Sequence, residues 1–144
     1  MALELLSFER ATAQLAQSLT YVHSPAAKED TGLHEQLRNA VIHCFTVTYE
    51  LSWKMLKRYL EATEASPAGL DMGSFQSLIR LANERGLLRS DWTVWRNYRQ
   101  ARTDSSHTHD AAKAEAVFAV AADFLPEAQA LSAQLQARQT RNHD

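Results

Sequence analysis

The sequence predicts an all-α protein, namely an antiparallel up-down four-helix bundle with a short extra helix between the second and third bundle helices. Apolar residues recur at three- and four-residue spacing over four long stretches, which is the period of an amphipathic helix. Glycine and proline are rare, with 4 and 3 among 144 residues, and good helix formers dominate the composition. A chain of this length can bury one core, so we expect a single helical domain over residues 1–144.

The first two bundle helices are predicted within residues 3–62. Apolar side chains recur at helical spacing over residues 3–22, and the first helix should end there because Pro25 disfavours helix in the residue before it. The polar residues 25–32 are predicted to form a loop. The second helix is the longest pattern and runs from about residue 33 to residue 62.

The second helix carries two apolar stripes, which together are wider than the face that one neighbouring helix buries. One stripe consists of Leu37, Val41, Cys44, Thr48, Leu51 and Met55, and the other of Ile42, Phe45, Tyr49, Trp53, Leu56 and Leu60. A second copy of the chain would cover the surplus, which predicts a homodimer. A thicker core within one chain is the alternative explanation.

The second half of the chain predicts one short and two long helices. A loop is expected over residues 65–69, and Asp71 is a candidate N-cap for a short helix that ends at Gly86. Ser90 or Asp91 is expected to cap the third bundle helix. Its apolar positions are Trp92, Trp95, Tyr98 and Ala101.

The fourth bundle helix is expected to follow a corner at residues 104–106, where Asp104, Ser105 or Ser106 would be its N-cap. Pro126 lies within its apolar pattern and is expected to kink the helix or divide it. Residues 138–144 are polar and are predicted to be a frayed tail.

Charge, cysteine content and hydropathy indicate which partners and which cellular location the sequence favours. The formal net charge is -2, so no global basic field attracts nucleic acid, and any contact with RNA must be local. Cys44 is the single cysteine, which excludes an intrachain disulfide and favours a reducing, cytoplasmic location. The chain begins without a basic segment and has no apolar run of about 18 residues, so we expect neither a signal peptide nor a membrane span.

Arg102 and His107 are the leading candidates for a functional site. On one unbroken helix five positions turn through roughly 500°, which leaves the two side chains some 140° apart. A break at residues 104–106 would let them converge, with His107 in the first turn of the next helix, where free N–H groups attract anions. Arginine offers a planar fork to phosphate and histidine moves protons near neutral pH, so the pair suits metal-free phosphodiester chemistry. Ordinary surface or capping roles are the alternative.

Several side chains lie close in sequence to this pair or have related chemistry. Arg99 shares a helix face with Arg102, and a bound phosphate would relieve their repulsion. His107 and His109 on a helix would point about 200° apart, which is poor geometry for joint metal ligation, so we expect no metal site and no cofactor. Glu50 is expected to pair with Lys54 at i,i+4 spacing. The aromatic residues are expected to be core rather than a base-stacking platform; these are Trp53, Trp92, Trp95 and Tyr98.

Two segments resemble a known family. The stretch around the candidate pair is similar to the Arg-x4-His signature of the HEPN superfamily, as found in the nucleotidyltransferase substrate-binding, or HepT-like, proteins. The matching residues are Trp95, Arg102, Ser106, His107, Thr108 and Asp110. Thr103 and His109 stand where that pattern usually has Asn and Tyr. Residues 38–60 resemble the second helix of the family, including Thr48-Tyr49-Glu50-Leu51 and Trp53-Lys54.

The resemblance implies a metal-independent endoribonuclease whose site forms where two protomers meet. Arg102 would stabilise charge on the scissile phosphate, and His107 would be general acid or base on the ribose 2′-hydroxyl or the leaving oxygen. Arg99, Ser106 and His109 are expected to contact nucleotide or phosphate.

The resemblance also implies partners. The chain would be the HEPN component of a two-gene module, paired with a minimal, antitoxin-like nucleotidyltransferase, and its ligand would be RNA or a nucleotide. In toxin–antitoxin relatives the Tyr at the position of His109 accepts AMP from the partner. His109 has no phenol, so this tyrosine modification cannot occur here. The alternatives are a non-catalytic subunit that binds nucleotide or substrate for the transferase, and a purely structural dimerisation bundle.

Overall fold

The computed structural model describes residues 4–64 and 74–143. Its helices in order are α1 (Leu6–Val22), α2 (Pro25–Glu29), α3 (Thr31–Thr63), α4 (Phe75–Glu84), α5 (Trp92–Asp104), the 3₁₀ turn η2 (Ser105–His107) and α6 (Ala111–His143). Those two ranges contain no β-strand, so the all-α prediction is confirmed.

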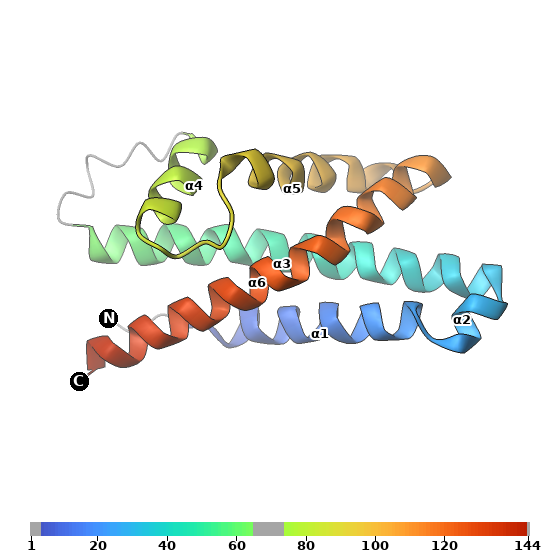
Figure 1. Ribbon diagram of the computed structural model, residues 1–144, viewed down its shortest axis with the longest axis horizontal. Coiled ribbons are helices and arrows are strands. Elements are labelled where there is room, and N and C mark those ends of the chain that lie inside the picture. Colours follow the sequence, from blue (N-terminus) through green and yellow to red (C-terminus); the bar gives the residue numbers. More distant parts are fainter. Residues whose placement is uncertain (1–3, 65–73, 144) are drawn as a thin grey trace.

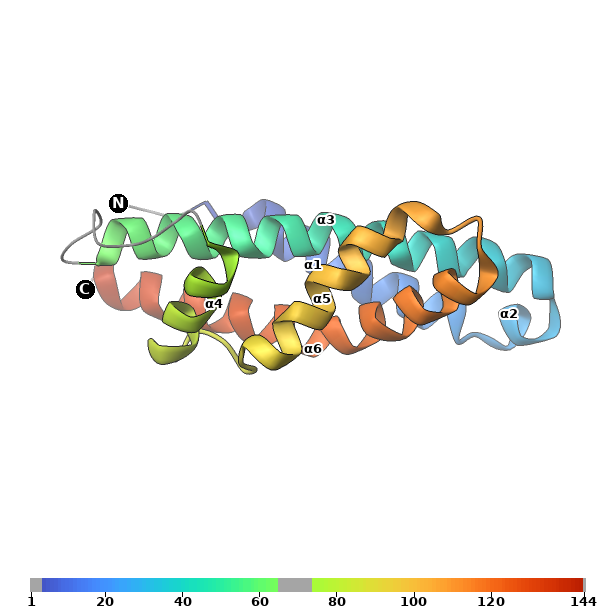
Figure 2. The same cartoon turned by 90° about the horizontal axis from the view of Figure 1, so that it is seen from above.

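The four long helices run in alternating directions, as the sequence predicts. α1 and α3 lie side by side and antiparallel, α5 runs back over α3, and α6 crosses the bundle diagonally (Figures 1 and 2). The short helix α4 lies between the end of α3 and the start of α5. α1 begins and α6 ends at the same end of the bundle, and α2 lies at the other end. In the described part of the chain no helix combines the length and the apolar character of a membrane span.

The stretch after α1 was predicted to be a loop, and this prediction is wrong because it contains α2. The Ser24 hydroxyl accepts a hydrogen bond from the Ala27 amide at 3.3 Å, and Pro25 occupies the first helical position. Proline suits that position because its fixed φ is helical and the missing N–H has no partner there in any case. Asp30 then caps α3 by accepting from the Leu33 amide at 3.1 Å. The second bundle helix therefore begins two residues earlier than predicted.

The end of α4 and the start of α5 agree with the sequence, but the start of α4 does not. Ser74 caps α4. The predicted cap, Asp71, lies outside the described residues. Gly86 ends the helix with φ of 73°, a left-handed conformation that glycine adopts without strain. Asp91 caps α5, which is one of the two residues predicted for that role.

α6 is one continuous helix through Pro126, so the predicted division into two pieces is wrong. Phe124 and Ala128 on either side of the proline are fully buried, and this packing holds the helix together across the hydrogen bond that Pro126 cannot donate. The segment predicted to be a frayed tail is helical as far as His143, and the Arg138 guanidinium donates to the Arg85 carbonyl at 2.6 Å.

Both apolar stripes of α3 pack against other helices of the same chain, although Leu37, Cys44, Leu51 and Trp53 are only partly buried. α1 packs along one side of α3, and α4, α5 and α6 contact its other sides. The buried stripe residues are Val41, Ile42, Phe45, Thr48, Tyr49, Met55, Leu56 and Leu60. A thick single-chain core, the alternative explanation, accounts for this pattern, and the two stripes therefore give no support to a dimer.

Aromatic rings fill the middle of the core. The Phe124 ring on α6 packs edge-to-face against Phe45, Trp95 and Tyr98, with centroid separations of 5.4, 5.7 and 4.9 Å. Trp95 and Tyr98 are buried, which confirms their prediction as core residues. These contacts fix α5 and α6 relative to α3.

One buried carboxylate joins the second half of the bundle. Glu127 on α6 is 1% exposed, and its two oxygens accept from the Arg89 amide at 3.0 Å and from the Tyr98 hydroxyl at 3.4 Å. Burial, and then the nearby Glu127 carboxylate, raise the pKa of Tyr98 well above its usual value. The carboxylate therefore ties the α4–α5 connection and α5 to α6.

Replacing this carboxylate should destabilise the protein. Glu127→Ala leaves two donors without an acceptor and should lower the free energy of unfolding by about 2–4 kcal/mol, measured by urea denaturation. Tyr98→Phe should cost less, since it removes one donor and leaves the Arg89 contact. Gln129→Ala, at an exposed position on the same helix, should change the free energy by less than about 0.5 kcal/mol. Equal stabilities for the Glu127 and Gln129 variants would contradict this role.

Candidate functional site

The corner between α5 and α6 lies where the sequence predicts a helix break. α5 ends at Asp104, the 3₁₀ turn η2 follows, and α6 begins at Ala111. The N-cap of α6, however, is Asp110, whose carboxylate accepts from the amides of Ala112 and Lys113 at 3.0 and 3.2 Å. The prediction that residues 104–106 cap this helix is therefore wrong. His107 lies before the cap rather than in the first turn of α6.

Local hydrogen bonds explain this difference. The Ser105 and Ser106 hydroxyls donate back to the carbonyls of Arg102 and Thr103, at 2.6 and 3.2 Å. Hydroxyls used in this way prolong the end of α5 as a 3₁₀ turn and are not available to cap the next helix. Asp110, the next side chain of a suitable type, therefore caps α6 instead.

The Arg102 side chain reaches from α5 to α3. Its Nε donates to Glu50 Oε1 at 3.1 Å, and one terminal nitrogen lies 3.4 Å from the Ser105 hydroxyl. The Arg102 side chain is 41% exposed. The predicted Glu50–Lys54 pair is not formed: Glu50 pairs with Arg102, and the Lys54 ammonium lies over the Trp53 ring, 5.8 Å from its centroid.

Arg99 has a different partner from Arg102. Its guanidinium lies 5.2 Å from the centroid of the Phe75 ring on α4. Phe75 in turn packs against Trp53 and Trp92, at 6.4 and 6.0 Å between centroids, and all three rings are partly buried. A bound phosphate is not needed to relieve the repulsion between the two guanidinium groups, because each has its own partner.

His107, His109 and Ser106 are exposed at the corner. The two imidazole rings are 6.0 Å apart between centroids and meet edge-to-face. The prediction that they point in opposite directions is wrong, because it assumed an α-helix and the segment is a 3₁₀ turn followed by an irregular turn. Within residues 4–64 and 74–143, no group of three or more His, Cys, Asp and Glu side chains is arranged to hold a metal ion.

A buried phenol lies behind the two arginines. Burial raises the pKa of Tyr49 well above its usual value, and Arg99 and Arg102 offset part of this shift while Glu50 adds to it. The phenol is therefore neutral at physiological pH and is a poor candidate for a general base.

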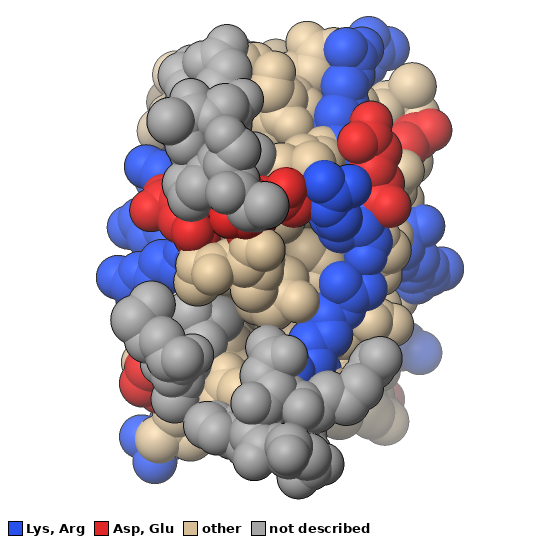
Figure 3. Space-filling view, turned by 90° about the vertical axis from the view of Figure 1, so that its left-hand side faces the viewer, with Lys and Arg blue, Asp and Glu red and all other residues tan. Residues whose placement is uncertain are grey.

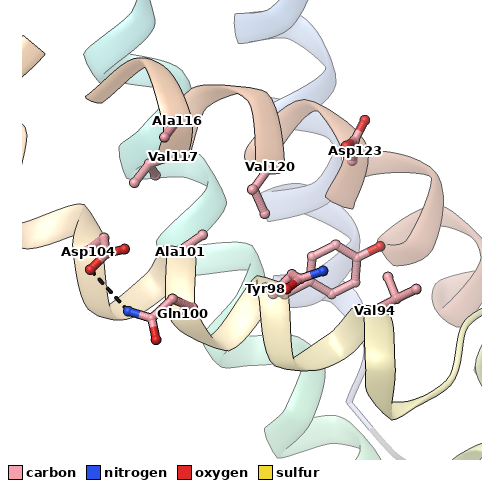
Figure 4. A pocket seen from close by; sticks show the side chains of 10 residues that line it. Val94, Tyr98, Gln100, Ala101, Asp104, Ala116, Val117, Val120 and Asp123 are labelled. Atoms are coloured by element: carbon pink, nitrogen blue, oxygen red, sulfur yellow. Dashed lines mark hydrogen bonds between the residues drawn. The ribbon is translucent and has the colours of Figure 1, made fainter. Parts of the chain in front are cut away.

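Two surface hollows on α5 lie apart from Arg102 and His107. A groove of about 290 Å³ between α5 and α6 has apolar walls that include Tyr98 and Val120, and Asp104 at its edge accepts from Gln100 at 3.2 Å (Figure 4). A second hollow, of about 420 Å³, is lined by Trp92, Arg96, Asn97, Arg99, Gln100 and Thr103. Neither hollow is lined by the candidate pair, which is presented at an exposed corner.

Charges of both signs are interspersed at the end of the bundle that carries α4. Figure 3 shows acidic residues beside the lysines and arginines on this face. Glu64 and Arg85 form one such pair there, at 2.7 Å, and hydrogen bonding to Arg85 lowers the pKa of the Glu64 carboxyl. The α5–α6 corner lies toward the other end of the bundle (Figure 1).

Sequence reasoning missed the role of Glu50 and the contact between Arg99 and Phe75. Glu50 lies 52 positions from Arg102 along the chain, so no periodicity connects them. The one available signal was that both residues fall in the two segments that resemble the same family.

Comparison with known proteins supports that resemblance. A profile of the family described as nucleotidyltransferase substrate binding protein like matches residues 3–137. The chain is 34% identical over 132 residues to a Haemophilus influenzae protein named probable ribonuclease HepT. This match covers 92% of this chain and 86% of the relative. A solved structure from Haemophilus influenzae, described as revealing the fold of a substrate binding domain of a nucleotidyltransferase, matches with a TM-score of 0.85 and 31% identity. That match covers 92% of this chain and 99% of the other.

The capping role of Asp110 gives a stability prediction. Asp110→Ala should lower the free energy of unfolding by about 1 kcal/mol, because two amides of α6 lose their acceptor. Asp110→Asn should retain most of the stability, since asparagine caps nearly as well. Urea denaturation of both variants measures the difference. If the alanine and asparagine variants lose the same free energy, Asp110 is not acting as the cap.

Proposed function

Because this chain belongs to the family of nucleotidyltransferase substrate binding protein-like proteins, we propose that it is the HEPN component of a two-gene nucleotidyltransferase module and a metal-independent endoribonuclease. The observation that carries the proposal is the α5–α6 corner, where the partly exposed guanidinium of Arg102 lies in the last turn of α5 and the exposed imidazole of His107 ends η2. The name of the relative, a probable ribonuclease, points to the same activity.

The two side chains have complementary roles in this chemistry. Arg102 binds a non-bridging oxygen of the scissile phosphate and stabilises the charge that develops there. His107 takes the proton from the ribose 2′-hydroxyl, whose oxygen attacks phosphorus, or gives a proton to the 5′-oxygen as its bond to phosphorus breaks. Arg99, Ser106 and His109 contact neighbouring phosphate or nucleotide groups. DNA lacks the 2′-hydroxyl and is not a substrate.

A homodimer would complete the site. In one chain Arg102 and His107 lie at an exposed corner, and neither of the two hollows on α5 encloses them. A second copy placed against this corner would exclude water and add a second imidazole, so that one could act as base and the other as acid. The dimer is proposed for this reason and not for the apolar stripes of α3.

The partner of the module is a small nucleotidyltransferase. Since His109 stands where AMP-accepting relatives have a tyrosine, we propose that the partner controls this protein by forming a complex that covers the corner. The second candidate function is a non-catalytic subunit that binds substrate for the transferase. The description of the solved relative as a substrate binding domain favours it.

The nuclease proposal is tested by RNA cleavage with EDTA present. His107→Ala and Arg102→Ala should each reduce cleavage by about 10²–10⁴-fold, while their circular dichroism spectra and unfolding midpoints stay close to wild type. His23→Ala removes an exposed imidazole at the end of α1 and should cleave normally. Cleavage that survives both corner substitutions would rule out this site, whereas an inactive wild-type protein would favour the substrate-binding alternative.

The module proposal is tested by co-expression with a small nucleotidyltransferase encoded beside this gene. The two proteins should purify together, the complex should cleave less RNA than the free protein does, and Arg102→Ala should leave the complex intact. Analytical ultracentrifugation of the single protein should show a dimer. A monomer that is fully active on RNA would rule out a shared site.

A further inference from the structure

Glu50 holds two donors from two different residues. Its Oε1 accepts from Arg102 Nε at 3.1 Å, and its Oε2 accepts from the indole Nε1 of Trp53 at 3.1 Å. Trp53 and Glu50 belong to α3, whereas Arg102 belongs to α5, so the carboxylate fixes the guanidinium to a neighbouring helix. Glu50 is 34% exposed, which places this arrangement at the edge of the core.

This arrangement leaves part of the Arg102 guanidinium available to a ligand. Arginine donates through Nε and through two terminal nitrogens arranged as a planar fork. Glu50 occupies Nε, and the Ser105 hydroxyl lies 3.4 Å from one terminal nitrogen. Of the five N–H groups, Glu50 takes the one on Nε and Ser105 takes one on a terminal nitrogen, which leaves three N–H groups on the terminal nitrogens to donate to a phosphate.

We propose that Glu50 is a positioning residue for Arg102, and that Trp53 holds the Glu50 carboxylate in place. This inference rests on the proposed function of Arg102 as the phosphate-binding group. Glu50 contacts no substrate. It fixes the guanidinium plane, with a terminal nitrogen beside Ser105 of η2, before an anion arrives.

Carboxylate chemistry explains why glutamate stands here. A carboxylate has two acceptor oxygens and satisfies both Arg102 Nε–H and Trp53 Nε1–H. An amide of the same shape has one oxygen and one NH₂ group, so in Glu50→Gln one of the two donors must face another donor. Removing the negative charge also makes the corner more positive, which strengthens its attraction for phosphate.

These two effects separate positioning from a merely structural role. Loss of orientation lowers turnover, whereas the added positive charge maintains or strengthens substrate binding. A variant that is partly unfolded instead loses binding and turnover together.

The first test is the kinetics of RNA cleavage by the full-length protein. In Glu50→Gln we expect kcat to fall by about 10–100-fold, as for other small misplacements of a catalytic group, with KM unchanged or lower. Affinity for the same RNA carrying a single 2′-deoxy at the cleavage position should be unchanged or tighter. Trp53→Phe, which keeps a ring but loses the indole donor, should show a smaller fall in kcat. Glu61→Gln is the matched control, because Glu61 pairs with Lys57 on the same helix, and it should behave as wild type.

Two kinetic outcomes would overturn the proposal. One is a wild-type kcat in Glu50→Gln. The other is a parallel loss of kcat, RNA affinity and free energy of unfolding, which would make Glu50 a purely structural residue.

The second test does not depend on nuclease activity. In ¹⁵N-labelled protein, Glu50→Gln should shift the Arg102 Nε–H and Trp53 Nε1–H resonances and speed their exchange with water, and Glu61→Gln should shift neither. Titration of the wild-type protein with inorganic phosphate should perturb the Arg102 resonance. Unchanged Arg102 and Trp53 resonances in Glu50→Gln would overturn the positioning role. A wild-type protein that shows the expected resonances but cleaves no RNA would refute the nuclease proposal alone.

Discussion

Packing of both apolar stripes of α3 within one chain is the constraint on which the other helices depend. A helix with one apolar face needs one neighbour, but α3 must be covered on several sides, by α1 along one and by α4, α5 and α6 along the others. The aromatic contacts of Phe124 then fix α5 against α3 and α6. This packing brings Arg102 within reach of Glu50, although 52 positions separate them along the chain.

The α5–α6 corner results from competition among short polar side chains. Each of Asp104, Ser105, Ser106 and Asp110 is a good N-cap by residue type. The two serine hydroxyls bind carbonyls of the preceding turn, so α5 tightens into η2 and the cap moves to Asp110. His107 therefore lies on the turn between the two helices. Its neighbour His109 approaches it to 6.0 Å between ring centroids, which a regular helix would not allow.

The sequence predicts elements whose cause is local and misses contacts whose cause is tertiary. The four long helices follow from the spacing of the apolar residues. Asp91 caps the start of α5 with its side chain, and Gly86 ends α4 because glycine adopts a left-handed conformation. α2 was missed because Ser24-Pro25 reads equally well as the end of one helix and the start of another. The Glu50–Arg102 pair was not predictable, because it depends on how α5 crosses α3.

The partners of the two arginines bear on how such a corner would select its ligand. Arg102 is paired with a carboxylate and Arg99 with an aromatic ring. These partners offset part of the positive charge, so the corner attracts an anion less strongly than two unpaired guanidinium groups would. The same contact with Glu50, however, holds the Arg102 guanidinium in one orientation. In the proposed nuclease, a phosphate that gains negative charge during phosphoryl transfer would interact more strongly with Arg102 than the ground-state diester does, since the attraction grows with charge. A guanidinium that is paired but held in a fixed orientation would therefore favour the transition state over the ground state, which is the condition for catalysis without tight substrate binding.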